Sequence, residues 1–231
     1  MLKLRPAVDR GHSQLDWLDS WHTFSFDQYY DPQHMSFGPL RVINEDTIAG
    51  GGGFGMHPHR DMEIITYVTS GKLRHQDSMG NGSIISSGEI QKMSAGTGVW
   101  HSEHNASADQ PVHLLQIWIM PEQKGLKPSY EQERFELKEG EWKLLGSPDG
   151  DGLISIRQKV KLYALSAADG QSSSFQPQKG SKLWIQIVKG QFAIQGKNSS
   201  SGDGVSIEKD ETLELKALSP GEILLFEILD N

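Results

Sequence analysis

Short β-rich runs separated by glycine turns follow one another at regular spacing through the first half of the chain. Residues 64–69 precede the turn Ser70-Gly71, and residues 99–105 follow a turn that ends at Gly98. No segment shows the longer period of an amphipathic helix. Short strands and turns in this order are typical of antiparallel sandwiches and jelly rolls. The sequence therefore predicts an all-β fold.

The second half of the chain repeats the pattern of the first. A β-rich run, a glycine turn and a return strand around Gly190 correspond to the same three parts around Gly71. This order of similar segments indicates an old duplication. A polar connector with several prolines and glycines, residues 121–150, lies between the two halves. We therefore expect two domains, an N-terminal one over residues 1–134 and a C-terminal one over residues 135–231.

Two short motifs each place two metal-binding side chains two residues apart, namely His57-Pro58-His59 and His101-Ser102-Glu103. Alternate residues of a strand point to the same face, so each pair would aim in one direction. Two such strands facing each other would bring three imidazoles and one carboxylate to a common point. This ligand set suits a divalent transition metal such as iron, zinc, copper, nickel or manganese. All nine histidines lie at or before His113, so the second half cannot repeat the site.

Two carboxylates compete for the fourth ligand position. Glu63 shares the strand parity of the first histidine pair, and Glu103 shares the parity of His101. Strand parity by itself does not decide which of the two carboxylates is the fourth ligand. We interpret His75 and His113 as ordinary surface or packed histidines.

A glycine-rich segment of seven residues, Ala49–Gly55, comes just before the first histidine pair. A nucleotide-binding loop is weakly supported, because no lysine follows in the required spacing and no helix pattern follows the glycines. Glycines that let the backbone pass close to a metal pocket explain the stretch better.

Aromatic side chains are concentrated in residues 11–40. Most of these rings are expected to pack as core or as a cover on the sheet, and some of them could wall a site for a flat, apolar ligand. The rings are Trp17, Trp21, Phe24, Phe26, Tyr29, Tyr30 and Phe37.

The composition excludes several classes of function. A formal net charge of −8 offers no basic face for phosphate backbones, so direct nucleic-acid binding is not expected. The absence of cysteine excludes disulfides, thiolate ligands and thiol nucleophiles. The first residues have no apolar signal-like core, and no run of about 18 apolar residues occurs. These features predict a soluble, cytoplasmic protein without a membrane partner.

The histidine motifs resemble those of the cupin superfamily. Its first motif is matched by a glycine, the His-x-His pair, a glutamate and a second glycine, with one gap that departs from the usual length. Its second motif is matched by a glycine, a histidine and an asparagine, although the usual proline before the glycine is missing. The matching residues are Gly51, His57, His59, Glu63 and Gly71, then Gly98, His101 and Asn105.

Within the cupins, the first half of the chain is similar to the pirin family. The resemblance is carried by the segments Trp17–Phe26, Leu40–Asn44, His57–Arg60, His75–Gly80 and Ser94–Glu103. It implies a bicupin of two jelly-roll domains, with metal only in the N-terminal one. It also places the fourth ligand at Glu103, which leaves Glu63 as a candidate acceptor for the N–H of a ligating imidazole.

The resemblance also implies an activity. Bacterial members of the family look like quercetinases, whereas the animal relatives look like nuclear transcriptional cofactors. We therefore expect a dioxygenase that opens a flavonol such as quercetin with O₂, with Glu103 as metal ligand and base. The expected cofactor is one divalent metal, Fe²⁺ before Cu, Ni, Mn or Zn, held by His57, His59, His101 and Glu103. The alternative is a metal-containing regulatory module that acts on a protein partner.

Overall fold

The computed structural model describes residues 2–209 and 211–229, and it divides them into two compact units. One unit spans residues 11–135, and the other combines the first ten residues with the chain from Glu136 onwards. In the described residues the regular elements are β-strands, apart from one short 3-10 turn, η1 (Ala7–Asp9). The predicted all-β fold with two jelly-roll domains is therefore confirmed. No helix of the described chain is long and apolar enough to span a membrane.

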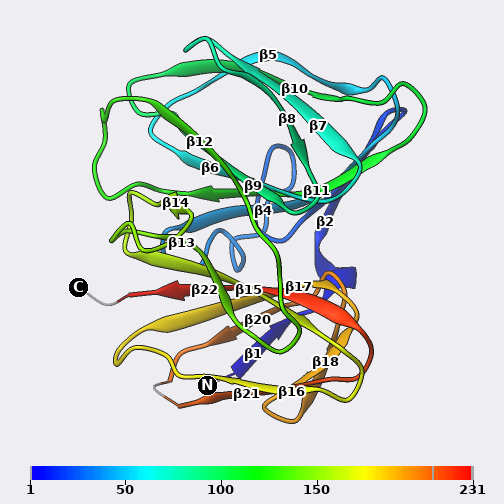
Figure 1. The fold of residues 1–231 in the computed structure, drawn as a ribbon, viewed down its shortest axis with the longest axis vertical. Coiled ribbons are helices and arrows are strands. Elements are labelled where there is room, and N and C mark those ends of the chain that lie inside the picture. Colours follow the sequence, from blue (N-terminus) through cyan, green and yellow to red (C-terminus); the bar gives the residue numbers. More distant parts are fainter. Residues whose placement is uncertain (1, 210, 230–231) are drawn as a thin grey trace. The chain divides into compact units, whose positions relative to one another are not determined.

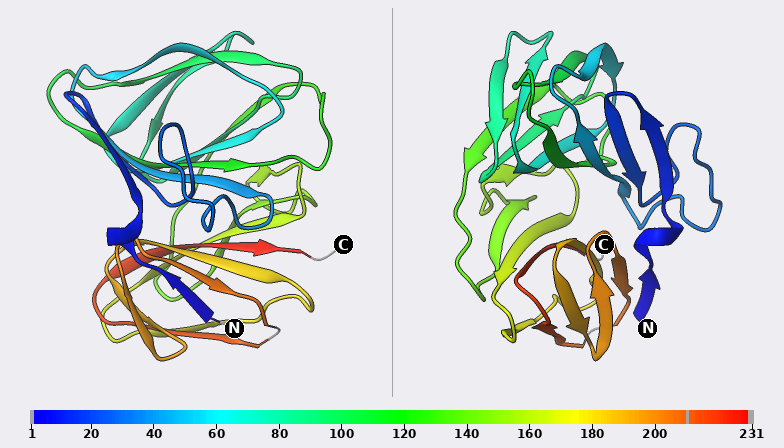
Figure 2. Two further views of the ribbon diagram at one scale, coloured as in Figure 1. Left: turned by 180° about the vertical axis from the view of Figure 1, so that it is seen from behind. Right: turned by 90° about the vertical axis from the view of Figure 1, so that its right-hand side faces the viewer.

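The unit of residues 11–135 consists of two antiparallel sheets (Figure 1). The smaller sheet has the order β5 (Gly53–His59), β10 (Val99–Asn105), β7 (Lys72–Asp77) and β8 (Gly82–Ser86). The larger sheet has the order β12 (Ser129–Arg134), β9 (Glu89–Ser94), β6 (Glu63–Ser70), β11 (Val112–Ile119), β4 (Leu40–Ile48), β3 (Leu18–His22) and β2 (Gly11–Leu15). The hairpin of β2 and β3, blue in Figure 2, extends this sheet beyond β4.

The other unit repeats this arrangement with one sheet of seven strands and one of four. The seven-stranded sheet has the order β1 (Leu2–Arg5), β20 (Gly204–Ile207), β17 (Lys182–Lys189), β22 (Gly221–Ile228), β15 (Val160–Ala167), β13 (Lys143–Ser147) and β14 (Ile154–Ser155). The four-stranded sheet has the order β16 (Ser172–Phe175), β21 (Leu213–Ala217), β18 (Gln191–Ile194) and β19 (Lys197–Ser200).

The first ten residues depart from the expected domain range of 1–134. Strand β1 pairs antiparallel with β20, with Leu2 opposite Ile207 and Arg5 opposite Gly204. These backbone pairs place residues 2–5 in the C-terminal sheet, although they begin the chain. The second division lies between Phe135 and Glu136, one residue after the expected one.

Strand periodicity explains how each unit forms its core. Along β7 exposed and buried residues alternate strictly, as expected for a strand with one face on the core. Central strands such as β17 are buried on both faces along most of their length. In the N-terminal unit one apolar cluster joins Leu18, Ile48, Leu73 and Leu114 across the two sheets.

Gly53 shows why a glycine stands at the start of β5. A Cβ atom at this position would lie 2.5 Å from both the backbone oxygen of Glu103 and the Cα atom of His104. Two backbones cannot approach this closely with a side chain between them. Gly55, two residues later in the same strand, has nothing within 4 Å of the corresponding point.

We predict that Gly53→Ala lowers the apparent stability by about 1–3 kcal/mol, because the new methyl group overpacks the contact between β5 and β10. Thermal unfolding measures the effect, and metal content should fall with it because the contact includes Glu103. Gly55→Ala is the matched control and should stay within about 0.5 kcal/mol of the wild type. Equal melting temperatures for both variants would contradict this explanation of the glycine.

Candidate metal centre

The two predicted ligand motifs lie on neighbouring antiparallel strands. His57 of β5 is directly opposite His101 of β10, and His59 is opposite Val99. The register shifts between His101 and Glu103, so that Phe54 is opposite Glu103 and β5 carries one extra residue. Bulges of this kind bend a strand and re-aim its side chains, often next to functional sites.

The three imidazole rings form a compact cluster. The ring centroid of His101 lies 4.5 Å from that of His57 and 4.8 Å from that of His59, and the His57 and His59 centroids are 4.8 Å apart. One nitrogen of each ring lies within 4.8 Å of the others. His57 Nδ1 donates a hydrogen bond to the Gly55 carbonyl oxygen at 2.8 Å, so its Nε2 carries the free lone pair.

Unpartnered buried nitrogens test whether these residues suit a metal. Among the described residues, His59 Nε2 and both ring nitrogens of His101 are buried and have no hydrogen-bond partner. Buried polar groups are nearly always paired, so such nitrogens call for a ligand. Burial lowers the pKa of His59 to about 4 and that of His101 to about 3, and neighbouring imidazoles add to both shifts. Both rings are therefore neutral at pH 7, as metal ligation requires. The donor set fits a divalent transition metal.

Glu103 is buried beside this cluster and is held by hydrogen bonds. Gln116 Nε2 of β11 lies 2.9 Å from each oxygen of the Glu103 carboxylate. The indole N–H of Trp118 donates to Gln116 Oε1 at 3.3 Å, which fixes the orientation of the amide. The carboxylate lies within 4.8 Å of nitrogens of His101 and His75, and it does not join the group of His57, His59 and His101.

Glu63 lies away from the imidazoles. Ser94 Oγ donates to its Oε2 atom at 3.0 Å, and Lys92 Nζ lies 3.5 Å from the same oxygen. The parity argument assumed one continuous strand from His57 to Glu63. The chain instead leaves β5 at His59 and turns through Asp61, whose φ is 50°, before β6 begins. Parity is therefore not carried across this turn.

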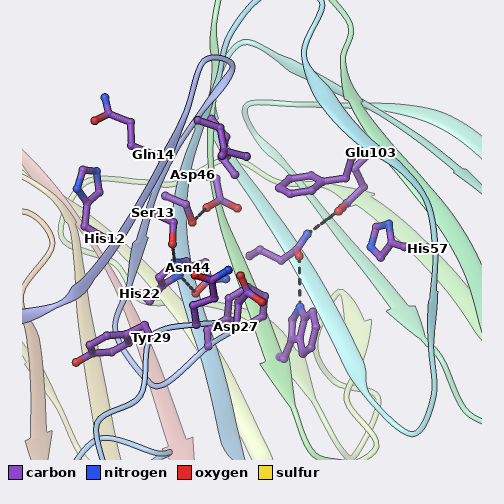
Figure 3. Close-up of a pocket in the computed structure, with 18 of the residues that line it drawn as sticks. His12, Ser13, Gln14, His22, Asp27, Tyr29, Asn44, Asp46, His57 and Glu103 are labelled. Atoms are coloured by element: carbon purple, nitrogen blue, oxygen red, sulfur yellow. Dashed lines mark hydrogen bonds between the residues drawn. The ribbon is translucent and has the colours of Figure 1, made fainter.

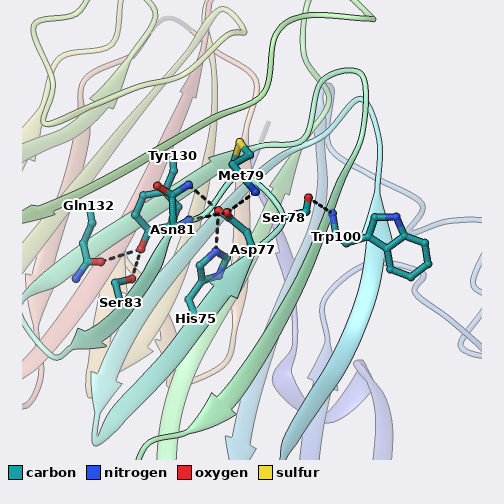
Figure 4. A network of polar contacts seen from close by, with 9 residues as sticks. All are labelled: His75, Asp77, Ser78, Met79, Asn81, Ser83, Trp100, Tyr130 and Gln132. Atoms are coloured by element: carbon teal, nitrogen blue, oxygen red, sulfur yellow. Dashed lines mark hydrogen bonds and ion pairs between the residues drawn. The ribbon is translucent and has the colours of Figure 1, made fainter.

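His75 is packed, as the sequence interpretation allowed, but that interpretation missed that it is buried within reach of His101 and Glu103. Figure 4 shows its contact with Asp77. The His75 ring centroid lies 5.2 Å from that of His101, and its Nε2 lies 3.3 Å from Asp77 Oδ2. Burial favours a higher pKa for Asp77, but hydrogen bonds from Asn81, His75 and the Met79 backbone outweigh it and lower that pKa. The Asp77 carboxylate is therefore charged and accepts the His75 N–H. The available signal was His75-x-Asp77, a third pair at a spacing of two.

A cavity of about 640 Å³ opens from the imidazoles onto the larger sheet (Figure 3). Phe26 and Tyr29 line it, so part of the aromatic segment walls the cavity, whereas Phe24 is buried in the core. None of the described residues that line it is lysine or arginine. The lining residues are His12, Ser13, Gln14, Leu15, Leu18, Ser20, His22, Phe26, Asp27, Gln28, Tyr29, Asn44, Asp46, Phe54, His57, His59, Glu103, Gln116 and Trp118.

Comparisons with known proteins cover both halves of the chain. The Pirin family model matches residues 4–119, and the model of the quercetinase C-terminal cupin domain matches residues 144–228. Quercetin 2,3-dioxygenase of Escherichia coli K12 is 49% identical over 229 residues, 99% of each sequence. The crystal structure of the bacterial pirin YhhW from Escherichia coli in complex with nickel(II) covers 100% of both chains, with 47% identity and a TM-score of 0.95. A quercetin 2,3-dioxygenase from Acinetobacter baumannii, 18% identical, has a TM-score of 0.82 over 97% of this chain and 85% of that chain, a likeness of fold alone.

We predict that wild-type protein binds about one equivalent of divalent metal and that His57→Ala and His101→Ala bind little. Each substitution removes one of three clustered donors, and the remaining two cannot complete a closed site. Elemental analysis of dialysed protein measures the metal. His34→Ala is the control, because this histidine bonds Asp31 outside the cavity. Stoichiometric metal in both cluster variants would place the site elsewhere.

We predict that Asp77→Asn weakens metal binding by about 10- to 100-fold, since the charge that orients His75 beside His101 is lost. Competition with a chelator measures the affinity, and the melting temperature shows whether the turn after β7 is intact. Asp109→Asn, in an exposed loop, is the matched control. A folded Asp77→Asn variant with unchanged metal affinity would show that the His75–Asp77 pair only fills space.

Proposed function

The chain belongs to the pirin family of bicupins, and from this premise we propose that it is a metal-dependent dioxygenase that opens a flavonol such as quercetin with O₂. One observation carries the proposal: three imidazoles cluster together, and two of them, His57 and His59, line one cavity with the buried carboxylate of Glu103. The Escherichia coli protein that is 49% identical over nearly the whole chain is named for this reaction.

The metal is assigned to His57, His59 and His101, with Glu103 as the fourth ligand. The unpartnered nitrogens of His59 and His101 support the first part of this assignment. The hydrogen bond that Glu63 accepts from Ser94 and its ion pair with Lys92 favour Glu103 over Glu63 for the second part. Fe²⁺ is the first choice of metal, and Ni²⁺ is an equal arm of the assay because the similar Escherichia coli structure contains nickel.

A bound metal supplies Lewis acidity that lowers the pKa of a substrate hydroxyl, together with the redox chemistry of ring opening. The protein supplies the base. Glu103 receives the proton of the flavonol 3-hydroxyl at a carboxylate oxygen, and it is ligand and base at different moments. Gln116 donates to both carboxylate oxygens, and Trp118 holds Gln116 in turn. This series of hydrogen bonds keeps the carboxylate aimed at the reacting end of the cavity.

The cavity fits a neutral aromatic ligand. Its volume of about 640 Å³ is in the range of small-molecule sites. Leu18, Phe54 and Trp118 provide apolar walls that exclude water from a flat ring. Because none of the described lining residues is lysine or arginine, a carboxylate or phosphate substrate would find no counter-charge except a metal. The substrate class is therefore a phenolic compound and not an organic acid.

We predict that Glu103→Gln reduces turnover by about 10²–10⁴-fold and loses less of the bound metal than of the activity. Glutamine keeps the shape and one oxygen donor but cannot accept the hydroxyl proton. The assay follows oxygen uptake and loss of flavonol absorbance in protein reconstituted separately with iron, copper, nickel and manganese.

Glu133→Gln is the matched control for this variant, because Glu133 is exposed on β12 and does not line the cavity. Full activity of Glu103→Gln would remove the base from the mechanism. If no metal form of the wild type turns over a flavonol above the free-metal background, the enzyme proposal fails, and the regulatory module becomes the better explanation.

A further inference from the structure

The cavity continues from Glu103 along one face of the larger sheet to a second, polar end. The strand register places Asn44 of β4 opposite Gln116 of β11, which bonds Glu103. On the other side of β4, His22 of β3 is opposite Asn44, and Ser20 is opposite Asp46. Residues directly opposite one another share a face, so these side chains stand on the same wall as Gln116.

Polar side chains at this end are buried and only partly paired. Asn44 is 3% and Asp46 is 4% exposed, and both line the cavity (Figure 3). Ser20 Oγ donates to one oxygen of Asp46, and His22 Nδ1 donates to Asn44 Oδ1 at 2.9 Å. Within the described chain, the amide N–H₂ of Asn44 and the second oxygen of Asp46 have no hydrogen-bond partner. The Asn44 amide is therefore a free donor and the second Asp46 oxygen a free acceptor, and hydrogen bonds from His22 and Ser20 fix their orientations.

The polar end of the cavity offers an anion no positively charged side chain among its described residues. Burial raises the pKa of Asp46 to about 7, an effect that the charge of Glu103 reinforces and the hydrogen bond from Ser20 opposes. Near neutral pH the carboxyl group is therefore protonated in part of the molecules and can donate as well as accept. The described lining offers no lysine or arginine. Uncharged hydroxyl groups are the ligand chemistry that matches an amide donor beside such a carboxyl group.

We propose that Asn44 and Asp46 form a subsite that binds the hydroxyl groups on the pendant phenyl ring of the substrate. The inference rests on the proposed function, because it assumes that the reacting hydroxyl lies at Glu103. Adjacent strands of a sheet are about 5 Å apart, so β4 lies one strand spacing from Gln116 and its contact with Glu103. A ligand anchored at Glu103 thus reaches Asn44 and Asp46 with its next ring. These residues select the substrate and take no part in the bond cleavage.

Two flavonols separate this role from the chemistry. Quercetin carries two hydroxyl groups on the pendant ring, and galangin is the same molecule without them. Dissociation constants are measured anaerobically on metal-loaded protein by quenching of tryptophan fluorescence, and turnover is measured by oxygen uptake. The readout is the ratio of the galangin constant to the quercetin constant, which cancels effects common to both ligands.

Asp46→Leu should lower this ratio by about 5- to 10-fold, because it removes a hydrogen bond to quercetin that galangin never makes. Asn44→Ala should act in the same direction and serves if Asp46→Leu fails to fold. Asp46→Asn keeps polar atoms in place and should restore most of the ratio. Asp109→Leu, in an exposed loop, is the control and should leave the ratio unchanged.

The outcomes distinguish the subsite from the proposed function. If the wild type turns over both flavonols and the ratio is the same in folded Asp46→Leu and Asn44→Ala, the subsite is refuted and the enzyme proposal stands. If neither flavonol is turned over but the ratio falls in the variants, the enzyme proposal is refuted and the subsite is supported. If a variant weakens the binding of quercetin and galangin equally, the proposal that the subsite recognises the hydroxyl groups of the pendant ring is refuted.

Discussion

The antiparallel pairing of β5 with β10 is the constraint on which the candidate site depends. It sets His57 opposite His101, and the shift in register before Glu103 turns the carboxylate towards β11 and its Gln116. The pairing is close enough that only a glycine fits at position 53, where backbone atoms of β10 occupy the space of a Cβ. Gly53 thus contributes to the site by allowing β5 and β10 to pack closely together.

Burying several imidazoles without partners works against the stability of the fold. Each unsatisfied buried polar group costs about 1–3 kcal/mol, and His59 and His101 together contribute three such nitrogens. A metal that binds the folded chain and not the unfolded one offsets this cost by mass action. The carbonyl oxygen of Gly55 is placed for the same end, because it accepts from Nδ1 of His57, the ring nitrogen that the metal would not use.

The C-terminal unit shows the same architecture, but none of its described residues belongs to a histidine and carboxylate group that could hold a metal. A tryptophan–glutamine contact occurs here too, since the indole N–H of Trp184 donates to Gln186 Oε1 at 3.4 Å. The amide of Gln186 donates to the backbone oxygen of Gly202, whereas Gln116 in the other unit donates to the Glu103 carboxylate. Its interior is filled by apolar side chains such as Leu165, Ile185 and Phe192. The amide of Gln186 is therefore satisfied within the unit itself.

The sequence by itself determined the features that depend on one continuous strand. Short β-rich runs and glycine turns at regular spacing were enough to predict the all-β class, and the two ligand pairs follow from residues two apart on β5 and β10. Tertiary structure alone decided which distant strands bring their side chains together. The turn at Asp61 breaks the parity that linked Glu63 to the histidines, and β1 pairs with β20 across most of the chain. The groups around Glu103 come from three strands: Gln116 from β11, His75 from β7, and Asn44 and Asp46 from β4. Their meeting depends on sheet order and register, which local periodicity does not encode.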